Sequence, residues 1–129
     1  MMEISRESTM SHIYPRARPM THWPVRRVAV SGDSMRPALE PGDRLLVLRL
    51  PRVRPKAGDV VAVVDPRDDG RVLVKRVSDV DAGGRLTVVG DNPAASTDSR
   101  TFGPVDPALV VGRAVYRYWP DARRGRLRH

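Results

Sequence analysis

The 129-residue sequence contains no cysteine. Disulfide bonds and thiolate metal sites are therefore excluded, and cysteine usage says nothing about the cellular compartment. The sequence also lacks any run of about 18 apolar residues, so it predicts no transmembrane helix. The basic, apolar and small-residue segments of a secretory signal are missing from the N-terminus as well. From these absences we expect a soluble, cytoplasmic chain.

Aromatic residues are scarce: two tryptophans, three tyrosines and one phenylalanine. So few rings offer no obvious platform for stacking nucleic-acid bases, and we expect no nucleic-acid partner. The net charge is nevertheless +8, with basic residues clustered near the C-terminus at Arg113, Arg117, Arg123, Arg124, Arg126 and Arg128. A solvated basic tail explains this cluster most simply, although peripheral contact with a membrane surface stays open.

The chain length suits one domain, and its valine-rich runs, separated by Gly, Pro and Asp turns, indicate short strands. We predict strands at residues 25–30, 44–50, 60–64, 71–80, 85–90 and 110–119, with a hairpin loop at 65–70 and an irregular polar loop at 91–103. The predicted fold is all-β (mainly β): a curled antiparallel sheet that forms a small barrel-like core with long functional loops. Residues 1–24 resemble a flexible leader, 25–119 form the domain and 120–129 are expected to be a frayed basic tail.

A serine, Ser34, follows the Gly32–Asp33 pair and precedes Met35 and Pro37. A serine hydroxyl is a weak nucleophile unless a base and an oxyanion site accompany it. A glycine turn with a proline kink can expose such a hydroxyl beside free backbone N–H groups. The same residues also suit an ordinary turn in which Ser and Asp bond their own backbone.

A lysine, Lys75, lies inside a predicted strand, on the same face as Leu73 and Val77. If that face is buried, desolvation lowers the pKa of the amine toward the range of a general base. If the face is exposed, the lysine protects a strand edge from aggregation. A histidine base is not expected, because His12 and His22 lie in the leader and His129 is the last residue.

The polar loop at 91–103 follows Gly90 and is dense in side-chain acceptors. Asp98 and Arg100 could form an ion pair that fixes the loop, and Ser96 could hydrogen-bond a lysine amine. A solvated loop with Asx-type turns is the simpler alternative.

Three ordered motifs resemble those of the type I signal peptidase family: Ser34-Met35-x-Pro37, Lys75-Arg76, and Gly90-Asp91-Asn92…Ser96-x-Asp98-Ser99-Arg100…Gly103. The resemblance covers roughly residues 28–115 and implies a Ser–Lys dyad on a β-rich fold. It implies that Ser34 is the nucleophile and Lys75 the general base, that Ser96 orients the lysine, and that Asp98 and Arg100 form a support pair. Asp91 would belong to the structural part of the third motif. Gly32, Asp33 and Ser34 would form the oxyanion turn, where some members carry a serine in place of Gly32.

Larger members of that family carry a membrane anchor and an extra β-domain between the lysine and the Gly-Asp-Asn motif. Here the segment between Lys75 and Gly90 is too short to hold such a domain. A short, arginine-rich chain without an anchor resembles the proteases that mature nickel-type superoxide dismutase by removing an N-terminal propeptide. That resemblance implies a protein precursor with an extended N-terminal peptide as the substrate, and neither a cofactor nor a metal.

The sequence therefore predicts a serine endopeptidase, with general signal-peptidase-like processing as an alternative role. LexA-like self-cleaving repressors share the serine motif, but the segment that precedes Ser34 is too short for a DNA-binding domain and linker. A basic module that binds nucleic acid or a membrane surface is the alternative outside enzymology, and it leaves the three ordered motifs unexplained.

Overall fold

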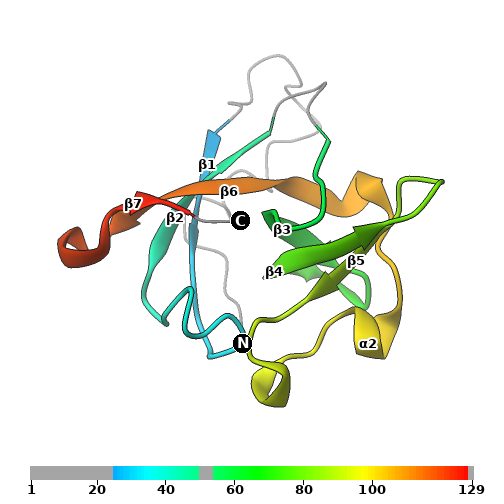
Figure 1. Cartoon of the computed structure of the whole chain (residues 1–129), viewed down its shortest axis with the longest axis horizontal. Coiled ribbons are helices and arrows are strands. Elements are labelled where there is room, and N and C mark those ends of the chain that lie inside the picture. The colour runs from blue at the N-terminus through cyan, green and yellow to red at the C-terminus, as the bar shows by residue number, and fades with distance from the viewer. Residues whose placement is uncertain (1–24, 50–53, 128–129) are drawn as a thin grey trace.

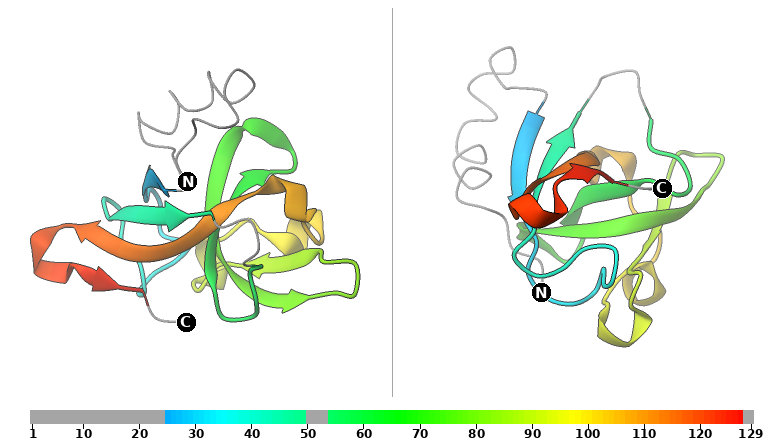
Figure 2. Two further views of the ribbon diagram at one scale, coloured as in Figure 1. Left: turned by 90° about the horizontal axis from the view of Figure 1, so that it is seen from above. Right: turned by 60° about the vertical axis from the view of Figure 1, so that its left-hand side comes forward.

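The computed structural model describes residues 25–49 and 54–127. The expected leader at 1–24 and the last two residues lie outside these ranges. Seven strands form one antiparallel sheet (Figures 1 and 2). They are β1 (Val25–Ala29), β2 (Arg44–Leu48), β3 (Val60–Asp65), β4 (Asp68–Val80), β5 (Leu86–Val89), β6 (Val110–Trp119) and β7 (Gly125–Arg126).

The strands lie side by side in the order β1-β2-β6-β3-β4-β5, and β7 pairs with β6. Irregularities in register occur in most pairs, for example between Val64 and Asp65 and between Ala62 and Val63. Such bulges bend strands and increase their twist, which curls the sheet. The mainly β, antiparallel prediction is confirmed. The sheet is not closed into a barrel, because its end strands β1 and β5 are not paired with each other in the described chain.

Valine dominates the core, as the composition of the predicted strands indicated. In β3 the residues Val60, Val61, Ala62 and Val63 are all buried, so both faces of this strand are covered. β3 lies between β6 and β4 in the sheet. A continuous apolar run is the pattern expected of a strand with no solvent-facing side.

The turn between β3 and β4 is tighter than predicted. We expected a loop at 65–70, whereas β4 begins at Asp68 and only Pro66 and Arg67 separate the strands. The Asp65 side chain accepts hydrogen bonds from the backbone and the guanidinium of Arg67. These bonds fix the turn locally, so strand pairing continues into residues that a composition argument assigns to the loop.

The polar loop after β5 is more ordered than the sequence indicated. It contains the 3₁₀ turn η1 (Pro93–Ala95) and the short helix α2 (Ser99–Phe102). The Asp98 carboxylate caps α2 by accepting a hydrogen bond from the backbone N–H of Arg100. A further 3₁₀ turn, η2 (Pro107–Leu109), leads into β6.

The expectation of a frayed C-terminal tail is wrong for residues 121–127. After β6 the chain forms the 3₁₀ turn η3 (Asp121–Arg123) and returns as β7, whose residues pair with Tyr116 and Arg117. Leu127 is buried in the core, and its N–H donates to the Val115 carbonyl at 3.1 Å. The hairpin of β6 and β7 projects at one end of the molecule (Figure 2).

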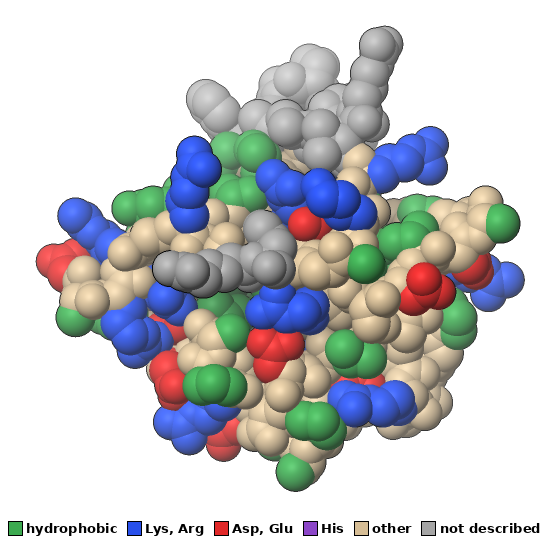
Figure 3. Space-filling model, in the orientation of Figure 1, with side chains coloured by type: hydrophobic (Ala, Val, Ile, Leu, Met, Phe, Trp, Pro, Cys, Tyr) green, Lys and Arg blue, Asp and Glu red, His purple; other side chains and the backbone are tan. Residues whose placement is uncertain are grey.

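Basic side chains are spread over the face seen in Figure 3, where Asp and Glu side chains lie among them. In the described chain several basic side chains form ion pairs, such as Arg76 with Asp91 and Arg36 with Glu40. Among the described residues, no helix has the length and hydrophobicity that crossing a bilayer requires.

Candidate active site

Ser34 is carried by the loop that joins β1 to β2, residues 30–43, here called the serine loop. At its base the Val30 N–H donates to the Asp43 carbonyl, and the Gly42 N–H donates to the Val30 carbonyl, each at 2.8 Å. Met35 and Leu39 are both 1% exposed, so the turn after Ser34 is anchored in the core. The loop therefore has a fixed base and an apolar anchor.

Backbone contacts hold Ser34 against the start of the polar loop. The Ser34 carbonyl accepts the Asn92 N–H at 2.8 Å, and the Asn92 side-chain amide donates to the Asp33 carbonyl at 3.1 Å. Ser34 is 8% exposed. Within the described part of the chain, its own N–H donates to no protein acceptor. Gly32 has φ +82°, a conformation that glycine adopts without strain.

Lys75 lies in the middle of β4, opposite Val61 of β3, and is only 3% exposed. Of the two alternatives for this strand face, the buried one is correct. Burial lowers the pKa of the Lys75 amine to about 8, against the attraction of Asp98 and with help from Arg100 and Arg71. The amine donates a hydrogen bond to Ser96 Oγ at 3.0 Å.

Beyond the lysine, the hydrogen bonds continue from Ser96 to Asp98. Ser96 Oγ donates to Asp98 Oδ2 at 2.6 Å, and the Gly90 N–H donates to the same oxygen at 2.8 Å. The Arg100 guanidinium and backbone N–H bind the other carboxylate oxygen, at 2.9 and 3.1 Å. Asp98 is fully buried, which raises its pKa, but these hydrogen bonds outweigh burial and hold the pKa well below its usual range. The carboxylate stays ionised and fixes the Ser96 hydroxyl.

Gly90 allows the loop to pass close to both hydroxyl-bearing residues. A Cβ atom at this position would lie 2.6 Å from Ser96 Cβ and 2.7 Å from the Ser34 carbonyl oxygen, and it would also overlap Ser96 Oγ. Real Cβ contacts of that length do not occur. The close approach of the three backbone segments therefore requires glycine.

Arg76, next to Lys75, ties β4 to the polar loop. Its guanidinium binds the two Asp91 carboxylate oxygens at 2.8 and 2.9 Å, and it also donates to the Gly58 carbonyl at 2.8 Å. Two parallel N–H···O bonds define direction as well as distance. This pair holds the Gly90-Asp91-Asn92 segment beside β4.

The structure thus brings Lys75, Ser96, Asp98 and Arg100 into one hydrogen-bonded chain. Backbone contacts with Asn92 hold Ser34 beside this group. Its hydroxyl forms no hydrogen bond with Lys75 in the described part of the chain. The contacts of Asn92 and the partner of Asp91 were not predicted. The asparagine that follows Gly-Asp was the available signal for the contacts of Asn92. The basic residue after Lys75 was the available signal for the partner of Asp91.

A lysine buried in an antiparallel sheet, beside a loop that presents a serine, points to the signal-peptidase-like class of peptidases. A family model described as Peptidase S24-like matches residues 6–115. Because this match spans most of the sequence, the chain belongs to the Peptidase S24-like family.

Individual relatives carry protease names. The chain is 39% identical to mitochondrial ATP-independent inner membrane protease subunit 1a of Arabidopsis thaliana, over 77% of this chain and 73% of the relative. It is 30% identical to mitochondrial inner membrane protease subunit 1 of Homo sapiens, over 78% and 74%. Identity to subunit 2 of Danio rerio is 31%, over 76% and 66%. These similarities support a peptidase of the signal-peptidase-like kind.

Proposed function

We propose that this protein is a serine endopeptidase in which Ser34 is the nucleophile and Lys75 the general base. One observation carries the proposal: Lys75 is buried with a pKa of about 8, and Ser96 fixes its amine. A general base works best when its pKa lies near the working pH, and the pKa of an ordinary lysine is too high.

Ser96 orients the amine for proton transfer. The Ser96 proton is committed to Asp98, so its oxygen can only accept from the lysine. A neutral amine has two N–H bonds and one lone pair. With one N–H bond held by Ser96, the lone pair is left to accept the Ser34 proton as the hydroxyl approaches.

The reaction then follows two steps. Ser34 Oγ bonds to the scissile carbonyl carbon while its proton passes to Lys75, and the resulting ammonium protonates the leaving amine as the C–N bond breaks. Water, deprotonated by the same lysine, then attacks the acyl-enzyme ester. The ester C–O bond breaks, and the ammonium returns its proton to Ser34 Oγ. The Ser34 N–H, which has no protein acceptor within the described residues, is the oxyanion donor in this proposal.

For the substrate we propose an extended N-terminal peptide, and specifically the propeptide of a nickel-type superoxide dismutase precursor. The resemblance of the sequence supports this choice, as does the direct turn between β4 and β5, where larger signal peptidases carry an extra domain. The names of the relatives favour a second candidate, general processing of signal-like peptides.

Cleavage of the nickel-type precursor by the purified protein, beside Ser34→Ala and Lys75→Ala, tests both parts. The expected result is propeptide removal by the wild type and none by either variant, with both variants folded by circular dichroism. Cleavage of a small-residue signal-peptide substrate, but not of the precursor, would retain the dyad and favour the second candidate. Cleavage that survives Lys75→Ala would refute the mechanism.

A further inference from the structure

The serine loop is also held from the side away from Asn92, through a buried carboxylate at its end. Asp43 is 1% exposed and receives two guanidinium groups from the β6–β7 hairpin. Arg117 Nη1 lies 3.2 Å from Asp43 Oδ2, and Arg123 binds Oδ1. Because these arginines lie far from Asp43 in the sequence, the contact joins an early loop to the last hairpin of the described chain.

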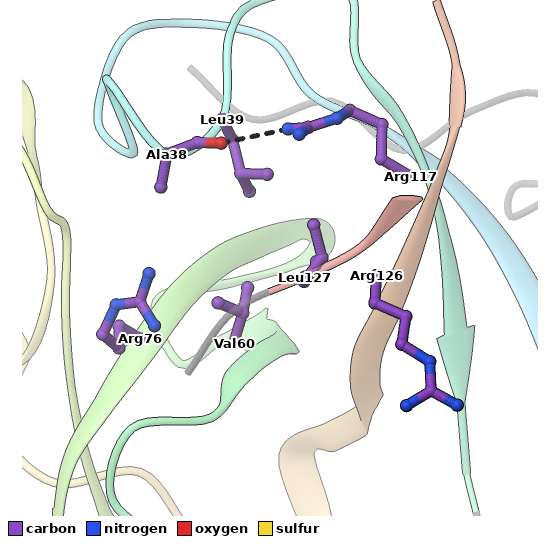
Figure 4. A pocket seen from close by; sticks show the side chains of 7 residues that line it. All are labelled: Ala38, Leu39, Val60, Arg76, Arg117, Arg126 and Leu127. Atoms are coloured by element: carbon purple, nitrogen blue, oxygen red, sulfur yellow. Dashed lines mark hydrogen bonds between the residues drawn. The ribbon is translucent and has the colours of Figure 1, made fainter. Parts of the chain in front are cut away.

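Arg117 makes further contacts that a simple ion pair does not need. Its Nη1 donates to the Ala38 carbonyl at 3.0 Å, across the pocket in Figure 4. Its Nε donates to the Arg123 carbonyl at 2.6 Å. One planar guanidinium therefore binds the serine loop at two points and its own hairpin at a third.

Asp43 also forms hydrogen bonds within the serine loop. Its Oδ2 accepts the Glu40 N–H at 2.9 Å, and its carbonyl accepts the Val30 N–H at the base of the loop. Asp43 thus links the hairpin to Glu40 through its carboxylate and to Val30, at the base of the loop, through its backbone carbonyl.

A pocket of about 150 Å³ is lined by residues of the loop, of the hairpin and of the strands β3 and β4. Ala38 and Leu39 line it from the loop, and Arg117, Arg126 and Leu127 line it from the hairpin. At this pocket Arg117 bridges the two parts, because its guanidinium donates to the Ala38 carbonyl.

Sheet pairing alone does not fix Ser34 relative to Lys75. The serine loop joins β1 and β2, whereas Lys75 is in β4, and both β6 and β3 lie between them in the sheet. The distance between the two side chains therefore depends on what holds the loop. Asn92 holds it on one side, and Arg117 and Arg123 hold it on the other.

We propose that Arg117 and Arg123 are positioning residues that act through Asp43. Through these contacts the β6–β7 hairpin holds the serine loop so that the Ser34 hydroxyl lies within reach of the Lys75 amine. The inference rests on the proposed function of Ser34 and Lys75. Displacing a reacting group by about 1 Å can cost about 100-fold in rate, so such a clamp would control turnover.

Arg117→Lys tests the inference while keeping a cation beside Asp43. A lysine retains the positive charge but cannot bind three acceptors in one plane. Arg113→Lys is the matched control, because Arg113 lies on the same strand and pairs with the buried Asp59 at 3.8 Å. The Arg113 contact does not involve the serine loop.

We expect kcat of Arg117→Lys to fall by about 10- to 100-fold with KM changed by less than about threefold. Arg113→Lys should keep kcat within about twofold of wild type, at a comparable melting temperature. Hydrogen exchange of the Leu39 and Asn92 amides, both bonded within or to the serine loop, should accelerate in Arg117→Lys only.

Unchanged kcat and unchanged exchange in Arg117→Lys would overturn the inference while leaving the dyad intact. An equal loss of kcat in Arg113→Lys would also overturn it, because the effect would then be one of general stability. If the wild type cleaves no substrate but exchange is faster in Arg117→Lys, the contact of the hairpin with Asp43 still holds the serine loop. The proposed peptidase function would then be rejected.

Discussion

At the scale of single residues, chemistry and stability make opposite demands on Lys75. A buried ammonium is unfavourable, and Lys75 is the one buried cation of the described chain. Arg100, which helps to lower the pKa of the lysine, also binds Asp98, whose charge raises it. The balance leaves the amine partly neutral near pH 8, where a base can accept a proton.

Replacing Ser96 by alanine tests whether the orientation of this amine matters. Ser96→Ala removes the acceptor of the Lys75 N–H and the donor to Asp98. We expect kcat/KM for peptide cleavage to fall by about 100-fold, within the range usual for a positioned base. Ser99→Ala is the control, because Ser99 Oγ accepts a structural bond from the Val88 N–H at 2.9 Å and, among the described residues, does not contact Lys75. Equal losses in both variants would remove the orienting role from Ser96.

At the scale of elements, the site is assembled from loops that meet at the end of β5. The Gly90-Asp91-Asn92 segment contacts Ser34 through Asn92, Ser96 through Gly90 and β4 through Asp91. The serine loop, the strand β4 and Ser96 thus all depend on one short segment.

Gly90→Ala should disturb all three contacts at once. Its Cβ would lie 2.7 Å from the Ser34 carbonyl oxygen, so the loops must separate. We expect the free energy of unfolding to fall by about 1–3 kcal/mol, as for other overpacked sites, and cleavage to be largely lost. Gly83→Ala is the control, since its Cβ meets the nearest atom, Asp81 Oδ1, at 3.5 Å. Chemical denaturation and the cleavage rate are the measurements, and a fully active Gly90→Ala protein would contradict this account of the site.

The strands could be predicted from local sequence patterns, whereas several other features of the fold could not. Valine runs and turn residues predicted the positions of β1 to β6 because side-chain shape and turn geometry act over a few residues. The two-residue turn before Asp68 depends on the Asp65–Arg67 contact, and β7 depends on pairing with β6. The first contact is local and our assignment of residues 65–70 to a loop overlooked it, whereas the pairing of β7 with β6 has no signature in the two residues of β7.

The candidate site divides in the same way. Ser34, Lys75 and the Asp98–Arg100 pair were predicted because each belongs to a short motif whose members are neighbours in the sequence. Arg117 and Arg123 bind an aspartate from a distant part of the chain, and one sequence contains nothing that links them. Whether Lys75 was buried also depended on what covered β4, which strand alternation leaves open.

At the scale of the whole molecule, the arginine content has a structural use. Each buried aspartate in the described ranges is paired with arginine: Asp43 with Arg117 and Arg123, Asp59 with Arg113, Asp65 with Arg67 and Asp98 with Arg100. Lys75, by contrast, has no carboxylate within ion-pair distance among the residues that the structure describes. Of the buried charged groups in the described ranges, the proposed base is therefore the one without an ion-pair partner.

Lys75→Met should therefore stabilise the protein. The folded-state pKa of Lys75 is about 8, against 10.5 for a free lysine. Below pH 8 folding therefore buries a charged ammonium group, which costs free energy of unfolding. The cost is fully present below pH 8 and is relieved as the pH rises from 8 to 10.5. We expect a gain of about 1–3 kcal/mol at about pH 7 and a smaller gain at about pH 9.5, measured by urea denaturation. A variant less stable than wild type at neutral pH would contradict a destabilised ammonium.

The most direct test of the Ser–Lys account is the pH dependence of Ser34 phosphonylation, in which the serine oxygen bonds to phosphorus and fluoride leaves. A serine-reactive fluorophosphonate should label Ser34, located by mass spectrometry, with a rate that rises with pH and is half-maximal near pH 8, where Lys75 loses its proton. The Lys75→Ala protein should label at a small fraction of that rate, without the midpoint near pH 8. A wild-type rate that does not change between about pH 6 and about pH 10, or that survives in Lys75→Ala, would contradict the account.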